Sequence, residues 1–160
     1  MPKQKELESI EGIEIAGFME PADEVGGDYY DVINCEGRIK IGIGDVTGHG
    51  LESGVLMIMA QTAVRTLLEN NETDSRKFLA TVNRTIYKNA NRMNSQKNMT
   101  LAMLDYSEGF LTLSGQHEEM IVVRSDGEVE LIDTEYLGFP LGLVEDIAWG
   151  GDNLSETHDR

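Results

Sequence analysis

Residues 26–50, GGDYYDVINCEGRIKIGIGDVTGHG, decide the fold because they place two aspartates in glycine-rich frames about one hairpin apart. Residues 31–34 have the character of a strand end, followed by a turn and, at residues 38–43, by a returning strand with isoleucine at every second position. This pattern predicts an antiparallel hairpin. The framed aspartates, Asp28 and Asp45, then lie on neighbouring strands and indicate a site for a hard metal ion.

The separation of the two aspartates depends on the length of the hairpin loop. A four-residue loop at residues 34–37 places Asp28 opposite Ile43 and makes Asp45 its diagonal neighbour, roughly 7–8 Å away. The three side chains then share one face of the sheet. Two carboxylates at this spacing can hold one ion each or share a water between two ions. A three-residue loop shifts the register by one residue and puts the aspartates on opposite faces.

The glycines around Asp45 have a physical reason of their own. Gly44, Gly48 and Gly50 let the backbone turn sharply out of the strand and approach a ligand closely. A backbone carbonyl in such a turn can also bind a metal ion, and His49 either orients a ligand or serves the start of the next helix. The alternative is an ordinary hairpin with solvated aspartates, followed by a strand-to-helix turn.

Composition limits the classes of function. The 160 residues fit one domain with a real core, since 40% are hydrophobic and 26% are charged. The net charge of -16 argues against binding to nucleic acid or to an anionic membrane. It is compatible with collecting divalent cations, although a solvated acidic surface explains it equally well.

Cysteine usage and the start of the chain point to a compartment. The single cysteine, Cys35, allows no internal disulfide and lacks the partners of a catalytic nucleophile. The first residues contain no apolar segment of signal-peptide or membrane-spanning length. We therefore expect a cytoplasmic protein.

The remaining pattern predicts a mixed α+β protein with largely antiparallel sheets. A short strand is expected at residues 13–18. Helical spacing of apolar residues predicts one helix over residues 55–68 and a second that is capped by Asp74 or Ser75 and continues to Met93. In later segments apolar and polar residues alternate, which predicts strands at 100–104, 110–113, 120–124 and 129–133. Residues 137–143 are expected to form a loop with buried apolar anchors.

Three motifs resemble a known family. Residues 21–32 (PADEVGGDYYDV), 44–50 (GDVTGHG) and 138–143 (GFPLGL) resemble the SpoIIE/RsbU-like branch of the bacterial PPM-type, or protein phosphatase 2C-like, serine/threonine phosphatases. The resemblance covers roughly residues 10–147. It implies an αββα sandwich with a dinuclear Mn²⁺ or Mg²⁺ centre at one edge.

The resemblance also implies roles for individual residues. Asp28 and Asp45 match catalytic metal ligands, and the backbone carbonyl of Val46 matches a further ligand. Gly44, Gly48 and His49 are expected to support these ligands without binding the ions themselves. A metal-bridging water is expected to attack phosphorus directly. The implied substrate is phosphoserine or phosphothreonine on a regulatory partner, such as an anti-sigma-factor antagonist in a signalling pathway.

The C-terminal part of the chain departs from the family pattern. Family members continue into strands that end in a Thr-Asp-Gly motif, whereas residues 148–160 form a polar tail without it. Asp152 and Asp159 lack the sequence context of replacement ligands, so we expect an incomplete domain with weak metal affinity and exposed strand edges that pair with a second copy. Two alternatives stay open: a catalytically incomplete module for partner binding or dimerisation, and a simple acidic module that binds divalent cations.

Two further residues near the motifs are assigned structural roles. Asp31 lies three residues beyond Asp28 and therefore points to the other face of the strand. His117 falls in an expected turn between strands, and a structural or solvent-exposed role is predicted for it.

Overall fold

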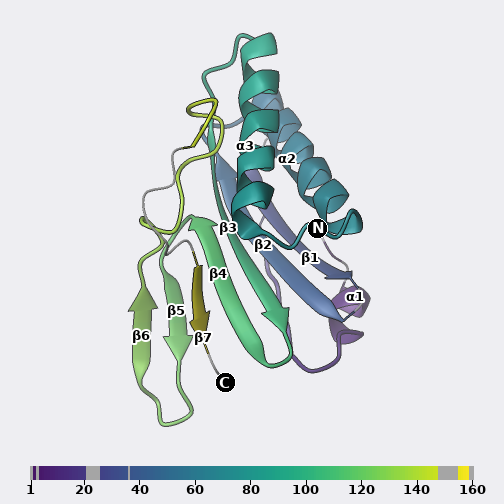
Figure 1. Cartoon of the computed structure of the whole chain (residues 1–160), viewed down its shortest axis with the longest axis vertical. Helices are drawn as coiled ribbons and strands as arrows, with labels where there is room; N and C mark the ends of the chain where they lie inside the picture. Colours follow the sequence, from purple (N-terminus) through teal and green to yellow (C-terminus); the bar gives the residue numbers. More distant parts are fainter. Residues whose placement is uncertain (1, 3, 21–25, 36, 148–154, 159–160) are drawn as a thin grey trace.

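One five-stranded antiparallel sheet organises the molecule. The computed structural model describes residues 2, 4–20, 26–35, 37–147 and 155–158. The strand order of the sheet is β1-β2-β3-β4-β7, and each neighbouring pair is antiparallel (Figure 1). Its strands are β1 Asp28–Cys35, β2 Arg38–Val46, β3 Met99–Ser107, β4 Phe110–Gln116 and β7 Ser155–His158.

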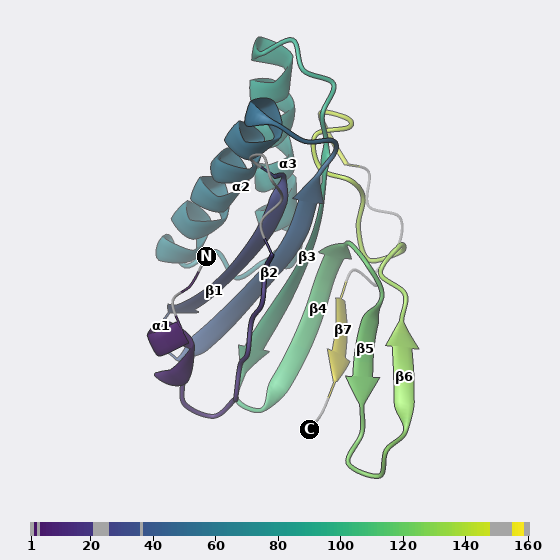
Figure 2. The same cartoon turned by 180° about the vertical axis from the view of Figure 1, so that it is seen from behind.

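Two long helices cover one face of this sheet. Helices α2 (Leu51–Glu69) and α3 (Ser75–Arg92) lie side by side on it, as both views show (Figures 1 and 2). Their apolar stripes bury residues such as Leu56, Val82 and Ile86 against strand residues of the main core. Within the described part of the chain, neither of these helices nor any other is long and apolar enough to cross a membrane.

The opposite face carries smaller clusters. The short helix α1 (Gln4–Glu8) and the segment after it run across this face (Figure 2), with Leu7 packed near Val32. The hairpin of β5 (Met120–Val123) and β6 (Val129–Ile132) forms a second, two-stranded sheet. The layers are therefore helices, large sheet and small sheet, which is the mixed antiparallel α+β arrangement that the sequence predicts.

The first hairpin differs from its prediction in register. Cys35 pairs with Arg38, so the connection contains only residues 36–37, and Gly37 adopts a φ of 87° that suits glycine. The expected four-residue loop, with Asp28 opposite Ile43, is therefore wrong. Both loop lengths are even, however, so every side chain keeps its predicted face.

Most other elements follow the sequence pattern, with two corrections. Helices α2 and α3 and strands β3 to β6 confirm the expected segments, and Asp74 caps α3 by accepting the backbone N–H groups of Arg76 and Lys77. Residues 13–18 do not form the expected strand; Ile13 and Ile15 pack against the cluster on the second face instead. Residues 155–158 pair with β4, so the expectation of a tail without a strand is wrong for these four residues. The domain boundary near residue 147 stays a prediction.

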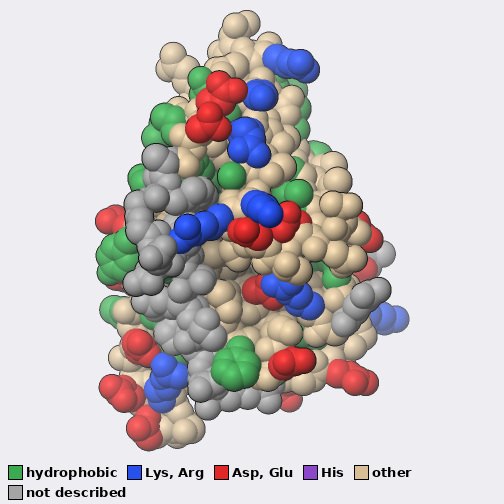
Figure 3. Space-filling view, in the orientation of Figure 1, with side chains coloured by type: hydrophobic (Ala, Val, Ile, Leu, Met, Phe, Trp, Pro, Cys, Tyr) green, Lys and Arg blue, Asp and Glu red, His purple; other side chains and the backbone are tan. Residues whose placement is uncertain are grey.

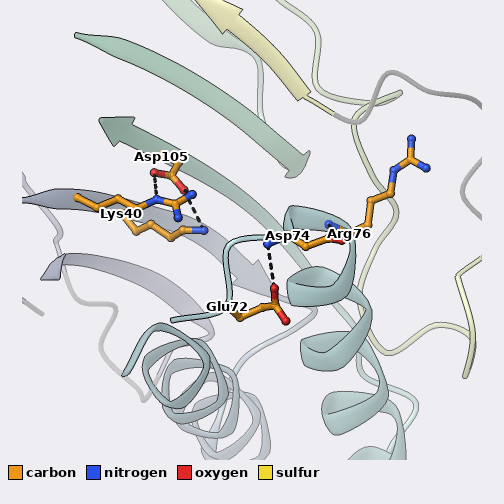
Figure 4. A network of polar contacts seen from close by, with 6 residues as sticks. Lys40, Glu72, Asp74, Arg76 and Asp105 are labelled. Carbon is orange, nitrogen blue, oxygen red and sulfur yellow. Dashed lines mark hydrogen bonds and ion pairs between the residues drawn. The ribbon is translucent and has the colours of Figure 1, made fainter. Parts of the chain in front are cut away.

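A buried charge cluster closes the end of the sheet far from Asp28. Asp105 on β3 accepts hydrogen bonds from Arg38 and lies 3.1 Å from the ammonium of Lys40, whose side chain is only 4% exposed (Figure 4). The Lys40 ammonium also lies 4.5 Å from the ring centroid of Phe78. Burial alone would raise the pKa of Asp105, but the Arg38 hydrogen bond and the charge of Lys40 lower it below its ordinary value.

Candidate active site

Asp28 and Asp45 face each other directly across two strands. Asp28 is the first residue of β1, Asp45 is the last but one of β2, and the two are register partners. Directly opposed side chains have their Cβ atoms roughly 4.5–5.5 Å apart, closer than the predicted diagonal spacing. Both side chains are exposed. The structure therefore brings the two predicted ligands together more closely than the sequence analysis expected.

The two carboxylates repel each other electrostatically. Partial burial raises the pKa of Asp45, and the neighbouring charge of Asp28 raises it further. His117 and a backbone hydrogen bond from Val46 act in the opposite direction without reversing the shift. A cation between the carboxylates would relieve this repulsion, because it favours the charged form of both.

Glycines allow the backbones around the aspartates to approach. The Val46 N–H donates to the Gly27 carbonyl at 3.2 Å, and a Cβ added to Gly27 would lie 2.5 Å from the Val46 carbonyl oxygen. The bare Gly27 thus leaves this oxygen unobstructed on that side. Gly44 stays within β2, where a Cβ would lie 2.3 Å from the Thr100 carbonyl oxygen. Its role is close strand packing, not the turn that the sequence predicts.

The turn after Asp45 is fastened to a distant segment. Gly48 and Gly50 have φ values of 74° and 92°, which confirms the predicted sharp turn there. Thr47 donates its N–H to the Asn98 carbonyl at 2.8 Å, and Lys97 donates its ammonium to the Thr47 carbonyl at 2.9 Å. His49 is exposed between the two glycines. No sequence motif indicates Lys97, which reaches this turn from 50 residues away.

His117 lies at the edge of the site, although the sequence pattern predicts only a structural or solvent-exposed role for it. Its Nδ1 lies 2.8 Å from the hydroxyl of Thr100, and Thr100 is the register partner of Asp45 on β3. The imidazole is half-buried and is close enough to Asp45 to lower the pKa of that carboxyl. Its backbone N–H donates to the hydroxyl of Thr134, which fixes the loop.

A strongly acidic cleft adjoins His117. It has a volume of about 430 Å³, and its acidic lining consists of Glu118, Glu119, Asp133 and Glu135. Nevertheless, no group of three His, Cys, Asp or Glu side chains in the described residues is arranged to hold a metal ion. Asp28 and Asp45 therefore present two carboxylates, the kind of oxygen donor that Mg²⁺ and Mn²⁺ prefer, and no third acidic or imidazole side chain among the described residues joins them.

Two residues near the motifs lie away from the site. Asp31 is buried on the helix face, 3.2 Å from the amide of Gln61 and 3.5 Å from the guanidinium of Arg65, as its predicted orientation requires. Cys35 packs against the main core. Asp152 and Asp159 lie outside the described residues.

Comparison with known proteins agrees with this geometry. Phosphoserine phosphatase RsbU of Bacillus subtilis (strain 168) is 27% identical over 139 residues, which is 85% of this chain and 40% of that protein. Two solved structures share the fold. One contains the RsbU and RsbW domains of Rv1364c from Mycobacterium tuberculosis (TM-score 0.61, 19% identity, 87% of this chain and 37% of that chain). The other contains the PP2C phosphatase domain of SpoIIE from Bacillus subtilis (TM-score 0.58, 15% identity, 88% and 40%).

The family assignment rests on a match over most of the chain. The family Stage II sporulation protein E (SpoIIE) matches residues 35–155, a range that contains Asp45, His117 and both long helices but not Asp28. The match covers more than half of the chain and agrees with the fold and with the RsbU relative. This chain belongs to the SpoIIE family and is similar to RsbU over most of its length.

Proposed function

We propose that this chain is a metal-dependent phosphatase domain that hydrolyses phosphoserine or phosphothreonine on a regulatory protein. The observation that carries the proposal is the direct opposition of Asp28 and Asp45 at one end of the sheet in a SpoIIE-family chain. These carboxylates and the Val46 backbone carbonyl would hold two Mn²⁺ or Mg²⁺ ions. When bound, the ions would neutralise charge on the phosphoryl group and lower the pKa of a coordinated water.

The charge of the site supports a requirement for cations. The site is lined by carboxylates, and a phosphoryl dianion would be repelled by them in the absence of a counterion. In this proposal Gly44 and Gly48 shape the backbone around Asp45, and His49 would orient a ligand of the ions. His117, whose Nδ1 lies 2.8 Å from the hydroxyl of Thr100, the register partner of Asp45, would donate a hydrogen bond toward the reacting group.

The substrate class follows from the relatives. RsbU is named as a phosphoserine phosphatase, and one structural neighbour contains RsbU and RsbW domains together. We propose a phosphorylated regulatory protein, such as an anti-sigma-factor antagonist, as the substrate, and signal transduction in the cytoplasm as the setting. The chain spans 40% of the length of RsbU, so these functions concern the domain that matches it.

The test is hydrolysis of p-nitrophenyl phosphate and of a phosphoserine peptide with Mn²⁺, with Mg²⁺ and with a chelator. Asp28→Asn and Asp45→Asn should each reduce turnover by about 100-fold or more, since each removes a charged ligand. Asp146→Asn is the matched control, because Asp146 is 82% exposed and its carboxylate lies beside Arg84 on α3. Turnover that persists in the chelator would contradict the proposal.

A second candidate is a non-catalytic module that binds a partner or a second copy. It is favoured by the lack of a third acidic or imidazole ligand among the described residues. A folded wild-type chain that binds Mn²⁺ but hydrolyses neither substrate would support it over the enzyme.

A further inference from the structure

The solvent side of the α2–α3 pair contains an apolar groove that the proposed chemistry does not use. The groove has a volume of about 380 Å³. Ile58, Met59, Ala63 and Leu67 line it from α2, and Ile58 is 59% exposed. The sheet lies on the other side of both helices, where their main apolar stripes are already buried (Figure 1). Met59, Ala63 and Leu67 also pack against the main core, so the groove is the open seam between the two helices, and Ile58 is its most exposed aliphatic side chain.

Four threonines make the groove more apolar than its sequence indicates. Thr62, Thr66, Thr81 and Thr85 line it, and each hydroxyl donates to the backbone carbonyl four residues earlier, at 2.7–2.9 Å. A hydroxyl bonded in this way is withdrawn into its own helix, and the methyl group remains for contact. The lining thus offers threonine methyl groups from both helices and aliphatic side chains from α2. Asn89 also lines the groove from α3, and its side-chain amide donates to the Thr85 carbonyl.

A basic helix borders the groove in an otherwise acidic protein. Helix α3 contains five Lys or Arg residues and no Asp or Glu, whereas the chain has a net charge of -16. Helical spacing places Lys77, Arg84 and Lys88 beside the Thr81–Thr85 stripe. Figure 3 shows basic side chains on the part of the surface where Figure 1 places α3.

The acidic residues near this border neutralise it only weakly. Arg84 lies 3.9 Å from Asp146 and Lys88 lies 3.6 Å from Glu145, and all four side chains are about half exposed or more. Such exposed pairs contribute little and are readily exchanged for a better partner. Within the described part of the chain, Lys77 makes no ion pair.

We propose that this groove binds an amphipathic helix of a partner protein, with its apolar stripe against α2 and an acidic flank against α3. A groove that runs between two helices accepts the side-chain ridge of a third helix, with anchors at i, i+3, i+4 and i+7. A second copy would bring another basic α3 to this border, and an anionic bilayer would be repelled by the net charge. The proposal is independent of the phosphatase chemistry.

The first experiment uses a labelled 15-residue helical peptide with leucines at i, i+3, i+4 and i+7 and glutamates along one flank. Fluorescence anisotropy measures its binding to the whole chain. A peptide of the same composition with a scrambled order separates the apolar stripe from charge alone. The chain is expected to bind the ordered peptide more tightly than the scrambled one. If it binds both peptides equally, or binds neither, the proposal is overturned.

Matched charge reversals locate the site. Lys88→Glu, at a side chain 62% exposed, should weaken binding about tenfold, and Lys5→Glu on α1, with the same change of charge, should leave it unchanged. Ile58→Ser should also weaken binding, and circular dichroism should show all three variants folded. If Lys88→Glu and Lys5→Glu bind the peptide with equal affinity, the proposal is overturned. Binding of the wild-type chain to phosphatidylserine vesicles, or formation of a dimer that excludes the peptide, would also overturn it.

Discussion

The two ends of strand β2 carry charge in opposite arrangements. At one end, Asp105 is bonded to Arg38 and Lys40, and the protein supplies both signs of charge itself. At the other end, Asp28 and Asp45 oppose each other as like charges at an exposed edge. The first arrangement stabilises the fold, whereas the second stores an unfavourable interaction that a ligand of opposite charge can relieve. Where charge is left uncompensated, a functional site is the natural interpretation.

The largest expected effect comes from breaking the compensated end. Asp105→Asn leaves Lys40, which is 4% exposed, without its anionic partner and should lower the free energy of unfolding by about 3–5 kcal/mol. Denaturation in urea measures this change. Asp146→Asn, at an exposed site, should change it by less than about 0.5 kcal/mol. A similar small effect at Asp105 would mean that the buried cluster does not hold this end of the sheet.

The next effect concerns the uncompensated end and its cation. Mn²⁺ at about ten times its dissociation constant should raise the free energy of unfolding by about 1.4 kcal/mol, because it binds the folded chain preferentially. Asp45→Asn should abolish this gain, whereas Asp105→Asn should retain it. Thermal unfolding with and without Mn²⁺ is the measurement, and equal gains in wild type and Asp45→Asn would place the ion elsewhere.

A smaller effect has the opposite sign to the first. Without metal, Asp45→Asn should raise stability by a few tenths of a kcal/mol, since it removes the repulsion from Asp28 at an exposed position. The same change from aspartate to asparagine would thus destabilise the protein at one end of β2 and stabilise it at the other. Loss of stability in metal-free Asp45→Asn would show that the carboxylate has a favourable partner in the free protein.

The smallest effect is a dependence on pH. The pKa of Asp105 is lowered on folding, so its contribution is present above the unfolded value of about 3.9 and is lost as the pH falls through the lower folded pKa. The pKa of Asp45 is raised, so its contribution is present below about 3.9 and is lost as the pH rises through the folded pKa. The stability difference between Asp45→Asn and wild type should therefore shrink in acid. A difference that grows in acid would mean that folding lowers the pKa of Asp45 instead of raising it.

The sequence predicted the hairpin, the helix pair and the shared face of the two aspartates because these depend on local periodicity. It gave the wrong register, because side-chain alternation is unchanged when a loop length changes by two residues. The pattern at residues 13–18 alternates like a strand, but those residues pack on the sheet as irregular chain. Local alternation reports a half-buried segment and not the hydrogen bonds that it makes.

Residues that arrive from far along the chain could not be predicted. His117 contacts the hydroxyl of Thr100, which β3 places beside Asp45. Lys97 reaches the turn after Asp45 through a hydrogen bond to the Thr47 carbonyl. The Arg38–Asp105 pair joins residues 67 apart in the chain. Each contact is decided by strand pairing across the sheet, which composition and spacing do not specify.

The position of the aspartate pair at the end of its ladder has a consequence for motion. Asp28 opens β1, so the like-charged rung is followed only by the Val46 N–H bond to Gly27. In the free protein this rung should open more often than the rungs toward Cys35, and its backbone protons should exchange with solvent sooner. An ion bound between the strands would slow that opening, so the exchange rate of the Val46 amide proton would report how much of the site is occupied.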